Sequence, residues 1–562
     1  MNKIRVLALG GIDEEGKDLY IIEVNNDIFV VGGGYKRPTK ATPGIDFIIS
    51  NYEYLVKNKD RVRAYIIPKA KDNVYGAIPY MINDVPAPIY CTELTTVLFK
   101  AFSLQRQIKY DYNFVKITLP SRIKIGGSYF HFFSTCASMP DTFGLAVETP
   151  LGNIVYSGDF IVEYGNDPLY KLDLNSLGKI AENPTLLLLA ESLNSTKGGY
   201  CSPYHRFYPS LVETFKKATG RIFVALHSNN FYRINEMFKA CFDFNKKIIF
   251  YDETSRKIYE LRKYMTSVQL NPKNIIPLED ILRYKENDLV IILSDTGEKI
   301  YQKVSLLVNH ENEEKQVRVH PGDTFIFGCP PSDTNEVIAT DILDETYRCG
   351  CEVRYETNKT LAIMHAYEED LKMLLSLFKP KYYLPIEGYY VNLLANARIA
   401  FDMHIGLSHT NIFLLDNGQP LTITENGATA DFYNSENINT EDIMIDGIGV
   451  GDVVSEIITE RNRLSEDGVA VFACAVSKST REIIAGPDVQ MRGFLFLKDK
   501  EADILLKEMS NMFVEAVNSW AKDTVTFATT QLTEDITTDI GRFLLRNSNR
   551  KPLVVPNIIV VD

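Results

Sequence analysis

The rhythm of strands and helices changes near residue 204, and this change constrains the fold more than any other feature of the chain. The first 200 residues hold short β-branched and aromatic runs separated by turn residues, a pattern typical of strands. These runs lie at 4–9, 20–24, 28–34, 63–68, 114–120, 129–135 and 152–160, with helices expected around 44–58 and 92–104. Several strands before the first long helix indicate stacked sheets with helices outside them, rather than a doubly wound sheet.

From residue 204 the chain alternates regularly between helices and apolar strands. Helices are predicted at 211–220, 233–244 and near 254–266, and strands at 221–226, 246–251 and 288–294. Such alternation is typical of a parallel α/β unit. The sequence therefore predicts that 204–356 is an α/β domain inserted into a core made of 1–203 and 357–425.

The end of the chain has the composition of a linker followed by a small domain. The stretch 423–442 is polar and rich in asparagine, and we expect a linker over 426–449. Beyond it, apolar runs at 467–477 and 551–562 predict strands, and 504–521 predicts a helix. We expect residues 450–562 to form a small α/β domain.

Net charge, cysteine spacing and the lack of long apolar runs bear on ligand class and cell compartment. The formal net charge of −13 argues against nucleic-acid binding by the whole surface but allows a local basic groove. The eight cysteines include no CxxC pair, and we expect reduced thiols. The first residues read as a strand, and no window approaches 18 uninterrupted apolar residues, so we expect a cytoplasmic protein without signal peptide or membrane span.

Motifs along nearly the whole chain occur in an order that resembles the ribonuclease J family. Those of the metallo-β-lactamase core are ALGGIDEEGKDLYIIE (8–23), GIDFIISNYEYLVKNKDRVRAYII (44–67), GAIPY (76–80) and YSGDF (156–160). The insert is similar to the family's β-CASP domain, and 365–390 to the return into the core. IDGIGVGDVV (445–454), LSEDG (464–468) and GPDVQMRGF (486–494) resemble its C-terminal domain. The resemblance implies an α/β protein: a metallo-β-lactamase αββα sandwich with an inserted β-CASP α/β domain and a small C-terminal α/β domain.

Active members of that family hydrolyse RNA with two metal ions, which can be zinc, magnesium or manganese, held by histidines and carboxylates. At the family's first two metal-binding histidines this chain has Lys69 and Lys71. An ammonium repels a metal cation. Four further ligand positions carry Gly32, Asn73, Val74 and Ala137.

Two of the family's metal positions keep a carboxylate. Asp159 matches the bridging aspartate, and Glu387 replaces the final histidine. None of the eight histidines forms an HxH or HExxH motif, on which two-metal sites usually depend. We therefore expect no resident metal cofactor, with Asp159 and Glu387 as vestigial ligands.

The substrate-binding positions of the family are partly retained. Glu191 fills the β-CASP acid position, and His365 lies in an Ile-Met-His-Ala loop where the family has Ser-Gly-His-Ala; both are expected to be vestigial catalytic residues. Asn230 and Arg233 match positions near the substrate. Together with Lys69 and Lys71 they are the candidate RNA or phosphate contacts.

Plainer readings of these residues stay open. Asp159 can accept hydrogen bonds in a turn, His365 can be a satisfied core histidine, and the two lysines can belong to a solvated loop. The sharper alternative for the lysines is that they replace the missing metal charge beside Asp159.

Three functions stay open as well. The first is a non-catalytic or weakly active subunit of RNA processing that scaffolds or modulates an active ribonuclease J paralogue or assembles with itself. The second is a residual metal-dependent ribonuclease that uses oxygen ligands. The third is a stand-alone RNA-binding protein.

Overall fold

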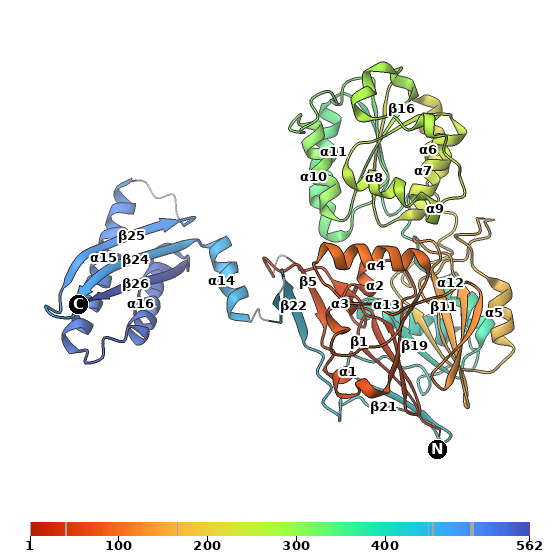
Figure 1. Ribbon diagram of the computed structural model, residues 1–562, viewed down its shortest axis with the longest axis horizontal. Helices are drawn as coiled ribbons and strands as arrows, with labels where there is room; N and C mark the ends of the chain where they lie inside the picture. The colour runs from red at the N-terminus through yellow and green to blue at the C-terminus, as the bar shows by residue number, and fades with distance from the viewer. Residues whose placement is uncertain (1, 40–41, 166, 448, 452–454, 495–498) are drawn as a thin grey trace. The chain divides into compact units, whose positions relative to one another are not determined.

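The computed structural model describes residues 2–39, 42–165, 167–447, 449–451, 455–494 and 499–562. The chain divides into two compact units, one of Met1–Lys36 with Ile49–Asp442 and one of Arg37–Ile48 with Ile443–Asp562 (Figure 1). Within the described ranges, no helix has both the length and the apolar character needed to cross a membrane.

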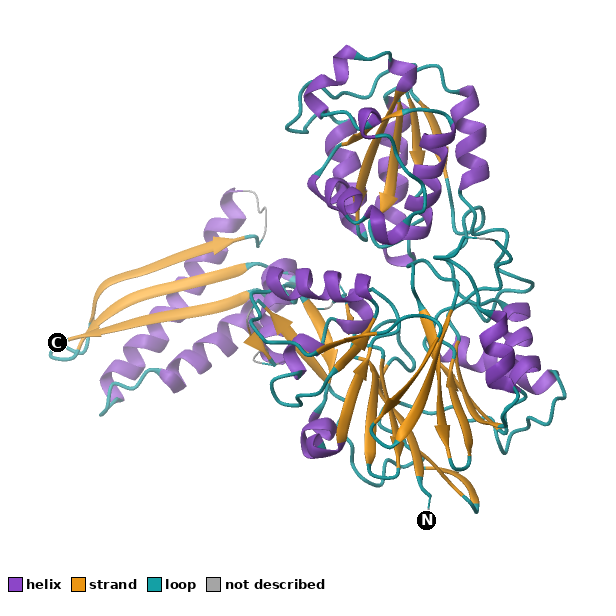
Figure 2. Cartoon of the chain, turned by 45° about the vertical axis from the view of Figure 1, so that its right-hand side comes forward, coloured by secondary structure: helices purple, strands orange, loops and turns teal. Residues whose placement is uncertain are grey.

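Two mixed sheets form the core of the first unit. The eight-stranded sheet has the order β21-β20-β1-β2-β3-β6-β7-β8, and the six-stranded sheet has the order β19-β13-β12-β11-β10-β9 (Figure 2). The strands of the first are β1 (Ile4–Gly10), β2 (Leu19–Val24), β3 (Asp27–Gly32), β6 (Val62–Ile66), β7 (Ile89–Cys91), β8 (Phe114–Lys116), β20 (Leu421–Thr424) and β21 (Gly427–Ala430). Those of the second are β9 (Ser121–Ile125), β10 (Ser128–Ser134), β11 (Phe143–Thr149), β12 (Gly152–Tyr156), β13 (Thr185–Glu191) and β19 (Tyr382–Ile386).

Successive side chains of a strand point to opposite faces of its sheet, so each sheet buries one face against the other sheet and one against helices. Inward-facing residues of both sheets share one apolar cluster, in which Phe29 of β3 meets Phe130 of β10 with 4.7 Å between ring centroids. The opposite face of the six-stranded sheet is covered by α5 (Leu174–Ala181), α12 (Glu368–Phe378) and α13 (Tyr390–Asp402). On the other sheet, α4 (Glu93–Gln105) packs Phe99 against Phe114 of β8. Short helices α1 (Glu53–Lys57), α2 (Asp72–Tyr75) and α3 (Ile78–Met81) complete this side. The result is the expected αββα sandwich.

A parallel five-stranded sheet interrupts the sandwich between β13 and β19. Its order is β15-β16-β14-β17-β18, and all its pairs are parallel. The strands are β14 (Ile222–His227), β15 (Lys247–Phe250), β16 (Leu289–Asp295), β17 (Thr324–Phe327) and β18 (Glu352–Tyr355). Helices α6 (Tyr208–Lys217), α7 (Phe231–Asp243), α8 (Glu253–Glu260) and α9 (Arg262–Met265) cover one face, and α10 (Glu298–Val308) and α11 (Glu336–Arg348) cover the other (Figure 1). This is the inserted α/β domain that the strand–helix alternation predicts.

The second unit contains a three-stranded sheet with helices on one face. The sheet has the order β25-β24-β26, from β24 (Val469–Ser477), β25 (Ile483–Arg492) and β26 (Leu553–Val561). Helices α15 (Asp499–Asp523) and α16 (Thr530–Ser548) bury Phe513 and Ile540 against it. Two short strands, β22 (Asp442–Asp446) and β23 (Gly449–Val450), pair with one another, and α14 (Ser455–Glu466) follows them.

Two local expectations are wrong. Residues 427–430, expected in a linker, form β21, which pairs with β20 at the edge of the eight-stranded sheet. Its polar composition suits an edge strand with one solvated face. The stretch 44–58, expected to be helical, contains β5 (Phe47–Ser50) and only a short helix, α1, because the apolar run Phe47–Ile49 is buried as a strand. β4 (Tyr35–Lys36) precedes it.

Candidate functional site at the strand ends

The candidate site lies where several strands of both sheets end. β12, β13 and β19 are parallel neighbours, so Asp159, Glu191 and Glu387 emerge at one edge of their sheet. In the facing sheet β6 runs parallel to β3, and Lys69 follows β6. Parallel strands bring their carboxyl ends to the same edge, which is where α/β folds build binding sites. Residues far apart in the sequence therefore converge.

Lys69 lies at the centre of this cluster. Its side chain is 4% exposed, and Nζ donates to Asp159 Oδ1 at 2.7 Å and Oδ2 at 2.5 Å. Nζ also lies 3.5 Å from Glu387 Oε1. Lys69 is thus a buried ion-pair partner and not a solvated loop residue. Its contact with RNA phosphate stays a prediction.

The ionisation of the cluster follows from one ammonium among several carboxylates. Burial alone lowers the pKa of Lys69, but Asp159, Glu387 and Asp18 raise it well above its usual value. Burial raises the pKa of Asp159, yet Lys69, His365 and Lys71 lower it to about 2. The pKa of Glu387 is raised, by burial and then by Asp159. Lys69 and Asp159 are therefore a charged pair, and Glu387 is the carboxyl that favours protonation.

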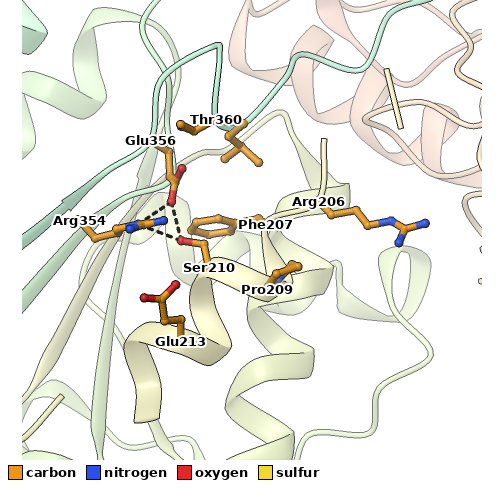
Figure 3. Close-up of a pocket in the computed structure, with 9 residues that line it drawn as sticks. Arg206, Phe207, Pro209, Ser210, Glu213, Arg354, Glu356 and Thr360 are labelled. Carbon is orange, nitrogen blue, oxygen red and sulfur yellow. Dashed lines mark hydrogen bonds and ion pairs between the residues drawn. The ribbon is translucent and has the colours of Figure 1, made fainter. Parts of the chain in front are cut away.

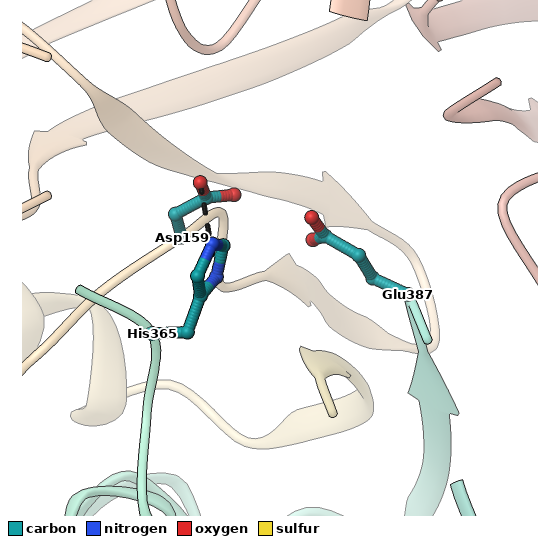
Figure 4. Close-up of side chains that lie close together, drawn as sticks. All are labelled: Asp159, His365 and Glu387. Atoms are coloured by element: carbon teal, nitrogen blue, oxygen red, sulfur yellow. Dashed lines mark ion pairs between the residues drawn. The ribbon is translucent and has the colours of Figure 1, made fainter. Parts of the chain in front are cut away.

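His365 and Glu191 form a second buried contact beside Asp159. His365 Nδ1 hydrogen-bonds Glu191 Oε2 and lies 3.9 Å from Asp159 Oδ2. The other oxygen of Glu191 accepts from the backbone N–H groups of Phe160 and Ala366, at 2.9 and 3.0 Å. Glu191 thereby ties the loop after β12 to the loop that carries His365. Figure 4 shows Asp159 and His365 together, with the carboxylate of Glu387 directed toward them.

Lys71 differs from Lys69 although only one residue separates them. It is half-buried, and its side chain makes no hydrogen bond or ion pair with the residues that the structure describes. Burial and the charge of Lys69 lower the pKa of Lys71 to about 8. Lys71 is therefore a cation near the cluster that lacks a described anionic partner.

Asn230 and Arg233 have structural contacts at the start of α7. Asn230 is the N-cap of that helix, and its side-chain oxygen accepts from Arg233 N at 3.2 Å. Arg233 is 3% exposed, and its guanidinium donates to the carbonyl oxygens of Leu361 and Ala362, while Nε finds no partner among the described residues. Burial lowers the pKa of Arg233 to about 10. Arg233 thus supports the loop that leads to His365, and its side chain is closed to solvent.

Asp18 belongs to the cluster but was missed by the sequence reasoning. It is 2% exposed, and Oδ1 has no hydrogen-bond partner within the described part of the chain. Burial raises its pKa to about 7, partly offset by Lys69. The antiparallel pairing of Leu19 with Gly32 places Asp18 at the same sheet edge as the end of β3. A carboxylate directly before a fully buried strand was the available signal.

Three of the other family ligand positions have side chains without a metal donor. Gly32 has φ +81°, and a Cβ there would lie 2.4 Å from the backbone oxygen of Asp18, so an aspartate cannot be accommodated without a backbone shift. Val74 and Ala137 are buried apolar residues.

A pocket of about 240 Å³ opens in the inserted domain near Leu361 (Figure 3). Arg354 Nε donates to Ser210 Oγ and Glu356 Oε1 in this pocket, at 3.2 and 3.0 Å. Ser210, Arg354 and Glu356 thus satisfy one another, and the other charged groups of the pocket, Arg206 and Glu213, pair with Glu163 and Lys217. The strand-end cluster is therefore the stronger candidate site.

The sandwich with strand-end residues and an inserted parallel domain defines the metallo-β-lactamase fold with a β-CASP insertion. Residues 219–345 match the family model described as Ribonuclease J, beta-CASP domain, and residues 456–561 match Ribonuclease J C-terminal domain. Both domains are thus similar to those of the ribonuclease J family, and the chain resembles members of that family over nearly its whole length.

Relatives match almost the whole chain. Ribonuclease J 2 of Staphylococcus epidermidis is 28% identical and that of Staphylococcus aureus 27% identical, each over 99% of this chain and 98% of the relative. A crystal structure of a protein of unknown function from Enterococcus faecalis covers 75% of this chain and 100% of its own, with 15% identity and a TM-score of 0.51. That structure supports the fold alone.

The residues present do not fit the pair of metal ions that the fold implies for active members. Of the expected ligand positions, only those of Asp159 and Glu387 carry a carboxylate, and the Lys69 ammonium contacts both. A metal ion and an ammonium compete for the same oxygens and repel one another.

Proposed function

We propose that the chain is a non-catalytic or weakly active subunit of RNA processing and decay, in the cytoplasm, that scaffolds or modulates an active ribonuclease J paralogue. The observation that carries this proposal is the ion pair of Lys69 with Asp159 in the former metal position. In the family's reaction, bound metal ions lower the pKa of the water that attacks the phosphodiester. With Lys69 in their place, no group at this site activates that water.

Similarity to the ribonuclease J family supports RNA as the ligand. Lys71, half-buried beside the cluster and without a described ion-pair partner, is the cation we assign to a phosphate contact. Arg233 is left out of this assignment because its guanidinium is buried against backbone carbonyls. Glu191 and His365 are assigned to holding the pocket together.

Retention of the C-terminal domain supports assembly with a paralogue or with a second copy. In this role the chain would contribute an RNA-binding surface and a subunit interface, and the partner would contribute the hydrolysis.

The test is decay of a 5′-monophosphorylated RNA by the purified full-length protein with magnesium and manganese, first alone and then with an active ribonuclease J. We expect no decay alone and an altered rate or product pattern in the mixture. Equal rates with and without this chain, together with no capture of the active paralogue, would contradict the proposal.

A second candidate is a residual single-metal ribonuclease. It is favoured by the donor atoms of Asp159, His365 and Glu387, which lie within 4.8 Å of one another. Metal-dependent decay by the protein alone that disappears in Asp159→Ala would establish it in place of the first.

A further inference from the structure

The strand-end cluster gathers several buried carboxyl groups around one lysine. Asp159, Glu387, Glu191 and Asp18 are all buried, whereas Lys69 is the only buried lysine that the described residues place among them. The buried Oδ1 of Asp18 has no hydrogen-bond partner among the described residues, and Asp18 interacts electrostatically with Lys69 and Asp159. Asp159 is the carboxyl that is held ionised, and a buried charge without a counter-charge is costly, so this pocket requires a cation.

Three side chains around Lys69 have the geometry of a cation site. Donor atoms of Asp159, His365 and Glu387 lie within 4.8 Å of one another. A divalent ion bound at about 2.0–2.2 Å would require donors separated by no more than about 4 Å, so small side-chain rotations suffice. Figure 4 shows that the three side chains converge from different loops.

Lys69 blocks this arrangement by charge and by position. Its Nζ contacts both oxygens of Asp159 and lies 3.5 Å from Glu387, so it uses two of the three donors. The backbone around Lys69 is also held in place, because Pro68 O accepts from Phe143 N and Lys69 O accepts from Lys71 N. The ammonium therefore cannot leave the cluster without exposing unpaired carboxylates.

We propose that Lys69 is a built-in cation that keeps this pocket folded without metal, and that it closes a latent single divalent-cation site formed by Asp159, His365 and Glu387. Removing the lysine side chain should open that site. The oxygen and imidazole donors suit Mn²⁺ or Zn²⁺. The inference rests on the proposed function only in treating the native site as free of a resident metal.

The experiment compares three full-length proteins: wild type, Lys69→Ala and the double variant Lys69→Ala/Asp159→Asn. Titration calorimetry with MnCl₂ alone measures binding, and thermal unfolding with MnCl₂ or with EDTA measures stability. We expect wild type to bind no Mn²⁺ at this site and to have the same melting temperature in both conditions. Lys69→Ala should melt several degrees lower in EDTA and gain one Mn²⁺ per chain, with much of the lost melting temperature restored.

The double variant and a neighbouring lysine provide controls. Lys69→Ala/Asp159→Asn should melt above Lys69→Ala in EDTA, because the uncompensated carboxylate is gone, and should bind no Mn²⁺. Lys71→Ala removes a cation of the same loop that has no described ion pair, and it should neither lower the melting temperature nor create a Mn²⁺ site.

Two results would overturn the inference. One is a wild-type protein whose Mn²⁺ binding is lost in Asp159→Asn, since the site would then be open with Lys69 in place. The other is a Lys69→Ala protein that is as stable as wild type and binds no Mn²⁺. If Lys69→Ala does not fold, the double variant decides: recovery of folding supports the counter-charge role, and failure of both contradicts it.

Failure of this inference is distinguishable from failure of the proposed function. The calorimetric and thermal measurements contain no RNA, and RNA decay by the wild-type protein alone would refute the function whatever Lys69→Ala binds.

Discussion

Two buried ion pairs of this chain have similar geometry but different surroundings. In the inserted domain, Arg221 contacts both oxygens of Asp323, from Nε at 2.9 Å and from a terminal nitrogen at 2.6 Å. In the sandwich, Lys69 contacts both oxygens of Asp159 at 2.7 and 2.5 Å. Both pairs are almost fully buried.

The difference lies in what else faces each cation. Arg221 also donates to Arg318 O, and Asp323 accepts from His320 N, so Arg221 has one carboxylate partner and its pair is completed by neutral hydrogen bonds. Lys69 instead faces the carboxyl groups of Asp159, Glu387 and Asp18. The first arrangement is a complete structural pair. The second surrounds one ammonium with carboxyl groups from several loops, as a metal ion would be surrounded.

Breaking the pair in the inserted domain should give the largest loss of stability without any ion dependence. Arg221→Met leaves Asp323 buried and unpaired, which costs about 3–5 kcal/mol of unfolding free energy. Urea denaturation measures it, and MnCl₂ should restore nothing, because the metal-type donor cluster found among the described residues is the one at Asp159. Arg221→Met/Asp323→Asn is the control and should recover part of the loss. Rescue of Arg221→Met by Mn²⁺ would remove the distinction between the two pairs.

Asp18 should make the stability of the sandwich fall as pH rises. Its pKa is about 7 in the folded protein, against 3.8 for the ordinary carboxyl. Below about pH 4 the group is protonated in both states; between about 4 and 7 only the unfolded state loses the proton, so stability decreases over that window. Asp18→Asn cannot titrate and should exceed wild type by a few kcal/mol above about pH 7, since a pKa difference of one corresponds to about 1.4 kcal/mol.

The measurement is urea unfolding of both proteins at several pH values. Asp159, with a pKa of about 2, titrates in acid and loses its contribution there, so it does not enter the window. Parallel stability curves for wild type and Asp18→Asn between about pH 4 and 7 would contradict a protonated Asp18.

Residue patterns predicted the αββα sandwich and the inserted parallel domain because their strands are buried runs with clear punctuation. The resemblance to the ribonuclease J family brought Asp159, Glu387, Glu191 and His365 into one candidate site, and the structure places these four together. Sequence could not show that Lys69 is paired while Lys71 is not, because that depends on which side chain reaches across to Asp159. It missed Asp18 for the same reason, since antiparallel pairing decides which strand starts lie beside which strand ends.

A smaller change in stability is expected at Asn230, where a helix-capping role can be separated from a phosphate contact. As the N-cap of α7 it should contribute about 1 kcal/mol, so Asn230→Ala should lower the unfolding free energy by that amount while Asn230→Asp preserves it. Gel-shift titration of the same proteins with single-stranded RNA tests the predicted phosphate contact. If Asn230→Asp keeps its stability but binds RNA more weakly, Asn230 both caps the helix and contacts phosphate. If RNA binding is unchanged, its role is the helix cap alone. An Asn230→Ala protein as stable as wild type would contradict the cap.

The smallest expected effect is on catalysis. Lys69→His with Lys71→His restores two imidazoles but should leave RNA decay at the wild-type level. Gly32 admits no aspartate without a backbone shift, and Val74 and Ala137 offer no donor, so a second metal ion still lacks ligands. Decay of a 5′-monophosphorylated RNA with manganese measures this, with circular dichroism as the folding control. Strong nuclease activity in the double variant would show that two histidines suffice, and the Lys69 ion pair would then be the whole difference between this site and an active one.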